Sequence, residues 1–456
     1  MTPTENVIND IVRDRLSEMP DEVIVRILSR MPTLDAVRTM LLRRFGELWT
    51  LVSTLWFDFD DYHDAMTDPP SSYLRVLSDF SRFVRNVLML HRGSSIATFE
   101  VYVYERDDYF DDPKMIDDAQ MWLRFAVNRG VRDLCFCFNG QNVFAPPHCV
   151  FTCQSIDTLV LNGCLIVEYE DEQPLHMGSL RKLALTSVYG CNDAFNQLIS
   201  GCPSLQELIV KDPLGLQLLN ITNPSISKLN LDLLDRYGDP LTLHCPNVKI
   251  LDIAISNQCE PFQLWVTYVS SLQVVNLKDL PNNCPYGLVK AIVKHFRNVE
   301  RFSLSRKAFK QLSSMKKLDF PQNSWKRLVL RPWWNHETCI QVIINLVKSS
   351  VKLEELIIYS GQSSVSKCSI DYRRFSYFDQ QTVISESFHL NLVMVPSEYT
   401  QDMYELGRSQ LSASGSKPLL NSEPVKPETG PGHTHNRRRE SPLIRRRGFH
   451  PKTNWQ

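Results

Sequence analysis

The chain has 456 residues, 43% of them hydrophobic, and its 50 Lys and Arg against 51 Asp and Glu give a formal net charge of −1. This composition is that of a folded globular protein and excludes a fibrous or wholly disordered chain. The charge is unevenly spread, because residues 409–456 hold nine Lys and Arg but three Glu. The other residues therefore carry 41 positive and 48 negative groups, an acidic body that does not favour nucleic acid as a partner.

Targeting signals, membrane spans and metal sites are not expected from the sequence. Residues 1–15 mix charges with isolated Val and Ile, and no apolar run reaches the roughly 20 residues that a membrane span needs. The twelve Cys are interpreted as reduced thiols, which indicates a cytoplasmic or nuclear location, or both. Cys149 and Cys153 have a spacing found in zinc sites, but no second ligand pair follows, so no metal or other cofactor is expected.

Residues 14–57 predict three short helices. Pro20 and the acidic residues after it suit the first turn of a helix, and Pro32 ends that helix. Thr33 or Asp35 can cap the second helix. Apolar residues at helical spacing support the first and third helices, and they are Val23, Ile24, Ile27, Leu28, Met31, Leu48, Trp49, Leu51 and Val52. Three such helices cannot bury much of a core alone and need a partner or the rest of the chain.

The order of short motifs in this stretch resembles an F-box in its plant form. The motifs are Asp14-Arg-Leu-Ser-Glu-Met-Pro-Asp-Glu-Val, Ile27-Leu-Ser, Met31-Pro-Thr, Asp35-Ala-Val-Arg-Thr, Leu48-Trp-Thr and Phe57-Asp. The resemblance implies that residues 10–58 form a three-helix F-box, which binds a Skp-type adaptor protein, and through it a cullin, by apolar helical faces. The matching positions are Leu16, Pro20, Ile24, Ile27, Leu28, Pro32 and Val37.

One departure from the family pattern lies at residues 42–47. The segment Leu-Arg-Arg-Phe-Gly-Glu is one residue short and has Phe45 where the family usually has Trp. A one-residue deletion in a helix rotates all later residues of that helix by about 100°. Two alternatives therefore stay open: a helical cap on a larger domain, and a repeat-based binding scaffold whose degenerate F-box has no ligase role.

The body of the chain repeats the pattern apolar-x-x-apolar-x-apolar ten times, at intervals of 21 to 28 residues. The ten triplets begin at Val131, Ile156, Leu180, Leu205, Ile226, Val248, Leu272, Val299, Trp325 and Leu353, and an earlier candidate begins at Ile96. This interval is that of leucine-rich repeats, in which each turn adds one short strand to a shared core. The sequence therefore predicts an α/β solenoid over residues 80–360, a leucine-rich-repeat horseshoe of about ten irregular repeats.

The spacers between triplets predict helices on the convex side of the solenoid. Apolar residues recur at helical spacing in 193–201, 286–298 and 339–349, and a helix over 115–129 would cover the first repeats. By contrast, the spacers at 212–224 and 232–245 contain Pro and look irregular.

From residue 10 to 360 the chain resembles the plant F-box/leucine-rich-repeat family. The FBD-containing type, with a divergent C-terminus, stays open because its further domain is not recognisable here. Residues 361–408 are expected to form a C-terminal cap, or a last strand near 388–395. Residues 409–456, with two triple-Arg runs, are expected to be a disordered basic tail that is either a solvated end or a nuclear-import signal.

The resemblance implies a non-catalytic protein, the substrate-recognition subunit of an SCF-type, cullin-based ubiquitin ligase. Its repeats would hold a target protein whose identity the sequence does not give. No catalytic motif argues for an enzyme, and the acidic clusters at 58–61, 107–112 and 168–172 are interpreted as solvated loops. A ligand-sensing receptor would need a pocket in the solenoid, and no membrane or nucleic-acid partner is expected.

Overall fold

In the computed structural model the described residues all belong to the first of two units of the chain, residues 1–401. The described residues are 19–42, 45–65, 73–104, 113–139, 144–168, 174–215, 219–233, 241–255, 264–280, 286–315, 319–331, 337–360 and 391–396. The predictions for Leu16, for residues 107–112 and for the basic tail at 409–456 therefore lie outside the described residues.

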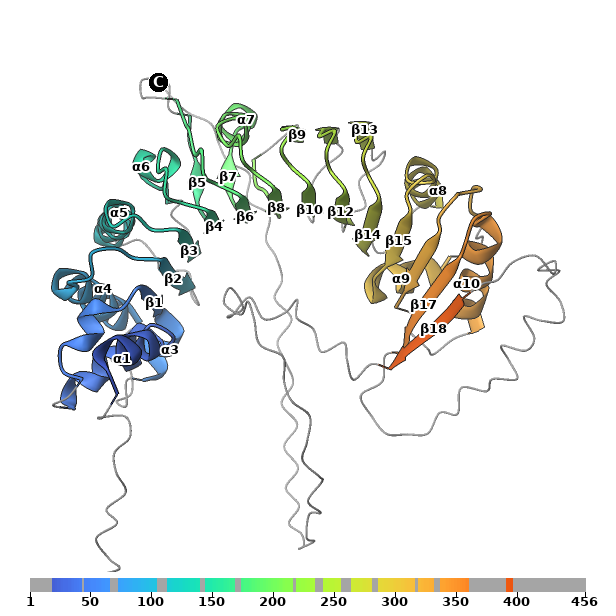
Figure 1. Ribbon diagram of the computed structural model, residues 1–456. Helices are drawn as coiled ribbons and strands as arrows, with labels where there is room; N and C mark the ends of the chain where they lie inside the picture. Colours follow the sequence, from blue (N-terminus) through green and yellow to red (C-terminus); the bar gives the residue numbers. More distant parts are fainter. Residues whose placement is uncertain are drawn as a thin grey trace, which may run out of the picture. The chain divides into compact units, whose positions relative to one another are not determined.

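One parallel sheet runs through the described part of the chain (Figure 1). Its thirteen strands follow one another in chain order, and neighbouring strands are hydrogen-bonded. The strands are β1 Thr54–Asp58, β2 Thr98–Tyr104, β3 Asp133–Asn139, β4 Thr158–Asn162, β6 Lys182–Thr186, β8 Glu207–Lys211, β10 Lys228–Leu233, β12 Ile250–Ile255, β14 Val274–Asp279, β15 Arg301–Leu304, β16 Arg327–Leu330, β17 Glu355–Ser360 and β18 Asn391–Pro396. Each chain crossover therefore adds one strand beside the last, as a solenoid requires.

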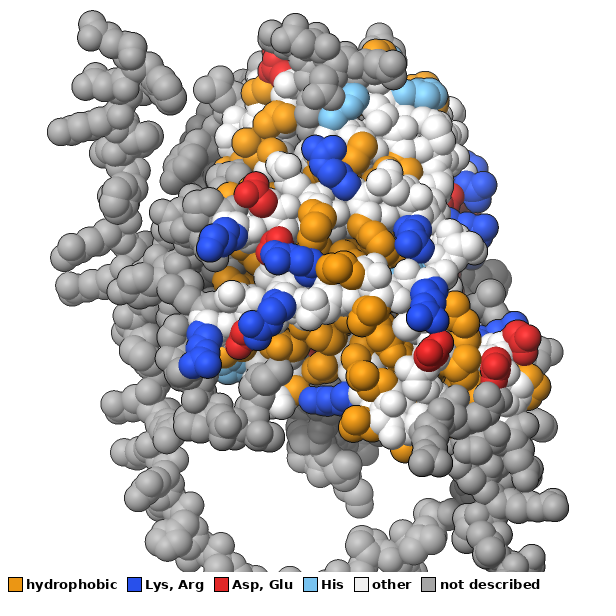
Figure 2. Space-filling view, turned by 90° about the vertical axis from the view of Figure 1, so that its left-hand side faces the viewer, with side chains coloured by type: hydrophobic (Ala, Val, Ile, Leu, Met, Phe, Trp, Pro, Cys, Tyr) orange, Lys and Arg blue, Asp and Glu red, His pale blue; other side chains and the backbone are white. Residues whose placement is uncertain are grey.

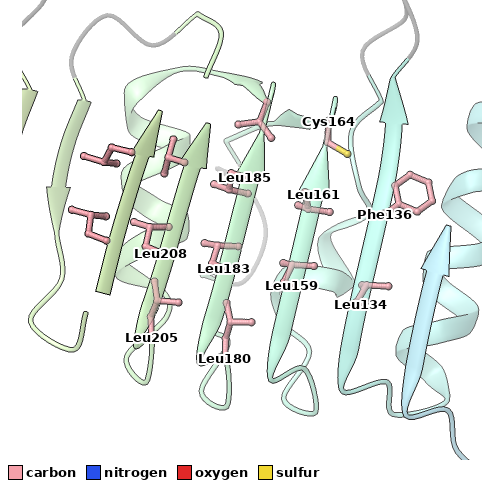
Figure 3. Close-up of a cluster of buried hydrophobic side chains, with 14 of the residues drawn as sticks. Leu134, Phe136, Leu159, Leu161, Cys164, Leu180, Leu183, Leu185, Leu205 and Leu208 are labelled. Carbon is pink, nitrogen blue, oxygen red and sulfur yellow. The ribbon is translucent and has the colours of Figure 1, made fainter. Parts of the chain in front are cut away.

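The register of this sheet follows the apolar triplets. Leu134 of β3 is aligned with Leu159 of β4, which is aligned with Leu183 of β6 and then with Leu208 of β8. The same alignment continues to Leu356 in β17, so the second residues of all ten predicted triplets form one row. Figure 3 shows this stacking for β3 to β8, where leucines of neighbouring strands lie side by side.

The predicted count of about ten repeats is not confirmed, because the sheet has strands beyond the ten triplets. Ile96, the first residue of the early candidate triplet, lies just before β2. Phe99 and Val101 of β2 are aligned with Leu134 and Phe136 of β3, so the early candidate continues the rows of core residues. β1 and β18 extend the sheet at its two ends. In β18, Asn391 is aligned with Glu355 of β17. Of the two alternatives that the sequence offered here, a cap or a last strand, a last strand is therefore present.

Helices lie on one side of the strands, as Figure 1 shows for α5, α6 and α7. The helices after β1 are α3 Phe59–Asp64, α4 Tyr73–Leu90, α5 Pro113–Asn128, α6 His148–Phe151, α7 Asn192–Ser200, α8 Tyr286–His295, α9 Arg306–Ser313 and α10 Glu337–Ser349. Four of them, α5, α7, α8 and α10, coincide with the spacers expected to be helical. Their buried faces join the strand leucines in one hydrophobic cluster, which puts the core between helices and sheet.

The two irregular spacers form strands of a second sheet. β11 Leu241–His244 is the central strand and pairs in parallel with β9 Leu219–Thr222 on one side and β13 Leu264–Tyr268 on the other. A further short pair joins β5 Leu165–Ile166 to β7 Tyr189–Gly190. The two irregular spacers contain Pro and lack a regular pattern of apolar residues at helical spacing. Their backbone groups form hydrogen bonds with the spacers of neighbouring repeats instead.

The described residues of the N-terminal segment form two α-helices, and the predicted three-helix F-box is not confirmed. α1 Asp21–Leu28 and α2 Thr33–Arg38 are followed by two 3₁₀ turns, η1 Thr39–Leu41 and η2 Leu48–Leu51. Val52 is already extended, with φ −60° and ψ 143°, because the chain must enter β1 at residue 54. The segment thus runs directly into the sheet.

Two local predictions in this segment are wrong. Pro32 is the residue preceding α2, and neither Thr33 nor Asp35 caps the helix through its side chain. Residues 58–61 are not a solvated loop, since Asp58 is buried and caps α3 by accepting hydrogen bonds from the backbone N–H groups of Asp60 and Asp61 at 2.9 and 3.2 Å. A carboxylate at a helix N-terminus satisfies donors that the helix itself cannot.

Candidate functional site

The apolar residues of α1 fall into two stripes with opposite environments. Ile24 and Leu28 are 3% and 4% exposed and belong to the hydrophobic core. Val23 and Ile27 are each 41% exposed on the adjoining stripe. Because residues four apart lie on one face of a helix, both pairs form continuous stripes, and only one of them is free to bind a partner.

The structure thus divides the predicted adaptor-binding residues. Ile27 and Pro20 are exposed, whereas Ile24 and Leu28 are core residues. Pro32 and Val37 are half-buried, and Val37 packs against the core. Leu16 lies outside the described residues.

Five exposed apolar residues of the same segment, Val23 among them, were not predicted as adaptor-binding positions. Met40, Leu41 and Leu42, on and just after η1, are 54%, 85% and 53% exposed, and Leu51 on η2 is 45% exposed. Figure 2 views the side on which α1, α3 and α4 lie in Figure 1, and on that face apolar side chains gather among Lys and Arg. The run Met40-Leu41-Leu42 was a usable signal, since three consecutive apolar residues cannot all face a core from one short turn.

The N-terminal segment is joined to β1 by two side-chain hydrogen bonds. Thr33 Oγ1 accepts from the backbone N–H of Trp56 at 2.7 Å, and Ser29 Oγ accepts from the backbone N–H of Ser53 at 3.1 Å. Ser29 Oγ also donates to the carbonyl of Val25 at 2.8 Å, which ties the same hydroxyl to α1. The exposed apolar residues are therefore carried by a segment attached to the sheet, not by an independent domain.

A second junction lies just after α4. The backbone N–H groups of Arg92 and Gly93 donate to the carbonyl of Thr50 at 2.8 and 3.1 Å. His91 Nε2 lies 2.9 Å from the carbonyl oxygen of Val52, and the guanidinium of Arg129 donates to the carbonyl of Gly93. Burial, together with the positive charge of Arg129, lowers the pKa of His91, which favours the neutral imidazole at this contact.

The strand positions that alternate with the core positions form a second face, called here the inner face of the sheet. In the middle of this face, opposite charges are paired across strands. Glu207 accepts from Lys228 at 2.6 Å and lies 3.5 Å from Lys182. Burial alone would raise the pKa of Glu207, but the hydrogen bond from Lys228 and the charge of Lys182 hold it below its usual value. Lys278 likewise pairs with Asp252 at 3.0 Å.

Within the described ranges, no three His, Cys, Asp or Glu side chains are arranged to hold a metal ion. Of the nine Cys that these ranges contain, none forms a disulfide. A search of the described helices found none that is both long and apolar enough to cross a membrane.

Two family models match the chain. An F-box domain model matches residues 16–56, and a model of the leucine-rich repeats of the FBD-associated F-box protein At5g56370 matches residues 119–276. Neither model describes an enzyme domain.

Relatives with both features are found in Arabidopsis thaliana. The chain is 31% identical over 251 residues to the F-box/FBD/LRR-repeat protein At5g56420, a match that covers 53% of this chain and 55% of that protein. It is also 31% identical to the F-box/FBD/LRR-repeat protein At3g52680, over 48% of this chain and 45% of that protein. The chain thus spans about half the length of these two relatives.

A longer match shows that the similarity includes both parts of the chain. The F-box/FBD/LRR-repeat protein At2g04230 is 26% identical over 385 residues, which cover 80% of this chain and 78% of that protein. The N-terminal segment with its exposed apolar residues and the apolar triplets of the sheet both agree with these matches. The chain is therefore similar to the Arabidopsis F-box/FBD/LRR-repeat proteins: residues 16–56, called here the F-box segment, match an F-box model, and residues 119–276 match a model of FBD-associated leucine-rich repeats.

Proposed function

We propose that this chain is the substrate-recognition subunit of an SCF-type ubiquitin ligase. F-box proteins with leucine-rich repeats are generally substrate adaptors of such ligases, and F-box domains generally bind Skp1-type adaptors. The observation that carries the proposal is the exposed apolar surface of the F-box segment. Val23, Ile27, Met40, Leu41 and Leu42 are all more than two-fifths exposed, although apolar side chains gain free energy by leaving water.

The attachment of this surface to the sheet supports the proposed role. A ligase subunit without catalytic groups contributes by holding its target at a fixed place relative to the adaptor. The hydrogen bonds from Ser53 and Trp56 to Ser29 and Thr33 restrict motion between the F-box segment and β1. The chain would therefore hold adaptor and target in a defined relation, while a cullin and its partners carry out ubiquitin transfer.

In this proposal the target protein binds the inner face of the sheet. Parallel strands stacked side by side present a long row of side chains, which is the surface that solenoid proteins use for extended partners. The outward positions of the strands differ in charge and size from repeat to repeat, so they can select a particular target.

Capture of a purified Skp-type adaptor by the full-length chain tests the proposal. The wild-type chain should capture the adaptor, and the double variant Val23→Asp with Ile27→Asp should lose capture because two charges would enter an apolar contact. Leu41→Asp should weaken capture in the same way.

The matched control is Val351→Asp, which places the same charge on a residue that is 48% exposed in the turn before β17. It should capture the adaptor as the wild type does. Variants of Ile24 and Leu28 do not serve this test, because those side chains are in the core and their loss would unfold the segment. If the folded wild-type chain captures no adaptor, the ligase role is wrong and a repeat scaffold with a degenerate F-box takes its place.

A further inference from the structure

The inner face of the sheet changes in charge along its length. On β1 to β3 its positions include Glu100 and Asp133 but no Lys or Arg. In the middle, Lys and carboxylate side chains pair with one another. On β15 and β16 the same face carries Arg301 and Arg327, and Arg331 follows directly after β16.

Two of these arginines are neighbours. Arg301 of β15 is directly aligned with Arg327 of β16 in the parallel register. Adjacent strands lie about 4.8 Å apart, so two like charges face each other across this pair, an arrangement that costs stability unless an anion lies between them. The register thus places two arginines on adjacent strands of this face, beyond the middle region where Lys and carboxylate side chains are paired.

The described residues supply little negative charge to this group. Arg327 pairs with Glu355 of β17, with 2.8 Å between its Nε and the carboxylate. Within the described part of the chain, Arg301 has no ion pair, and its buried Nε has no hydrogen-bond acceptor. A positive group without an anionic partner favours binding of a carboxylate, which would pair with the terminal N–H groups of the Arg301 guanidinium because its Nε is buried.

Arg331 adds a third positive group at a defined distance. It is exposed, and its guanidinium carbon lies 4.8 Å from the centre of the Tyr359 ring, a cation–π contact that holds the side chain against β17. It follows Arg327 by four residues on the same face, which is about 13 Å along an extended chain. Val329 is the inner-face residue between Arg327 and Arg331, and it is aligned with Ile357 of β17. Apolar side chains therefore separate the positive positions.

From this arrangement we propose that the inner face at β15 to β17, defined by Arg301, Arg327, Arg331 and Tyr359, binds an extended acidic segment of the target protein. Two carboxylate side chains four residues apart would meet Arg301 with Arg327 at one end and Arg331 at the other. Arginine forks bind carboxylates through paired hydrogen bonds, which gives direction as well as affinity. The acidic inner face of β2 and β3 would repel the same segment and so limit binding to one end of the sheet. The inference rests on the proposed function, since it names the class of target that the repeats would hold.

Selection from a random peptide library tests this proposal. Displayed peptides of about 12 residues, which extend over about 40 Å, are selected on the immobilised full-length chain. The peptides recovered should be enriched in Asp and Glu at two positions four residues apart. Recovery of no peptide, or of peptides without acidic enrichment, would overturn the proposal.

The best selected peptide is then labelled, and its dissociation constant is measured by fluorescence anisotropy. Arg301→Gln and Arg331→Gln should each weaken binding about tenfold, and Arg331→Lys should restore only part of it because the fork is lost. Lys182→Gln, on the same face but paired with Glu207, should leave the affinity unchanged. Equal losses in all variants, or tighter binding of a single-stranded oligonucleotide of equal length through the same arginines, would also contradict the proposal.

Failure of this proposal and failure of the proposed ligase role give different results. The double variant Arg301→Gln with Arg331→Gln should capture the adaptor as the wild type does, which also shows that it is folded. The F-box variant Val23→Asp with Ile27→Asp should bind the acidic peptide as the wild type does. If the wild-type chain binds the acidic peptide but captures no adaptor, the ligase role is contradicted and the acidic-segment proposal is not.

Discussion

The backbone N–H of Trp56 donates a 2.7 Å hydrogen bond to the hydroxyl oxygen of Thr33 and so joins the F-box segment to the first strand. β1 is at one end of the sheet and pairs only with β2, so its other edge has backbone donors that the sheet does not satisfy. Thr33, 1% exposed at the first position of α2, supplies one acceptor for that edge. The F-box segment therefore protects the end of the repeat sheet.

Replacing this hydroxyl is expected to destabilise the whole chain. Thr33→Val keeps the shape of the side chain but leaves the Trp56 N–H without an acceptor, which should lower the free energy of unfolding by about 1–3 kcal/mol. Thr33→Ser, which keeps the hydroxyl, should lose less. Urea unfolding followed by circular dichroism measures both, and equal stability of Thr33→Val and the wild type would show that the bond contributes nothing.

Substitution by Asp is expected to lower stability much more on the buried stripe of α1 than on the exposed stripe. Ile24→Asp buries a carboxylate in the core and should cost more than about 3 kcal/mol, whereas Ile27→Asp on the exposed stripe should cost about 0.5 kcal/mol or less. Thermal unfolding of the two variants beside the wild type checks the difference. Similar losses in both would mean that Ile27 is also a core residue.

His91 should make stability depend on pH. Its pKa is lowered in the folded chain by burial, with Arg129 adding to the effect, while the unfolded chain has the usual value of 6.5. Between these two values the unfolded state binds more protons, so the contribution of His91 is complete above pH 6.5 and is lost as the pH falls toward the folded pKa.

Urea unfolding at about pH 7.5 and about pH 5.5 measures this effect. Other groups titrate in the same range, so the comparison is with His91→Gln, whose amide can still donate to the Val52 carbonyl. The wild type should lose more stability on acidification than the variant does. An equal loss in both proteins would mean that His91 is not the responsible group.

The described cysteines should differ in reactivity although none forms a disulfide. Burial raises the pKa of Cys202 to about 12, and burial also raises the pKa of Cys245. Because the thiolate is the reactive form, these thiols should resist iodoacetamide at about pH 8 in the folded chain, while exposed Cys191 should react. Peptide mass spectrometry after labelling, with and without denaturant, identifies the modified residues. Labelling of Cys202 in the folded chain at the rate seen for Cys191 would contradict the assignment.

The sheet was predictable because its signal is local and repeated. Leucines two residues apart on a strand point to the same side, so the triplet at Leu180 or Leu205 already defines which side chains enter the core. The repeat interval then aligns each triplet with the next, and the observed register of Leu183 with Leu208 follows from it.

The binding surface of the F-box segment was not predictable in the same way. α1 has two apolar stripes, one through Val23 and Ile27 and one through Ile24 and Leu28, and a helix with two such stripes has no unique buried side. Only the position of η2 against α1 decides that Ile24 and Leu28 are covered. The third predicted helix is not confirmed for a related reason, since the chain must leave η2 extended to enter β1 at Thr54.

The sequence by itself thus determined the repeat fold, because its period and alternation are properties of each short segment. The tertiary structure decided which residues remain exposed at the F-box segment and, among the described residues, which charges of the inner face are paired. Arg301 and Arg327 are far apart in the chain and become neighbours only through the register of β15 with β16. Exposure and charge pairing depend on contacts between segments, and a single segment does not encode them.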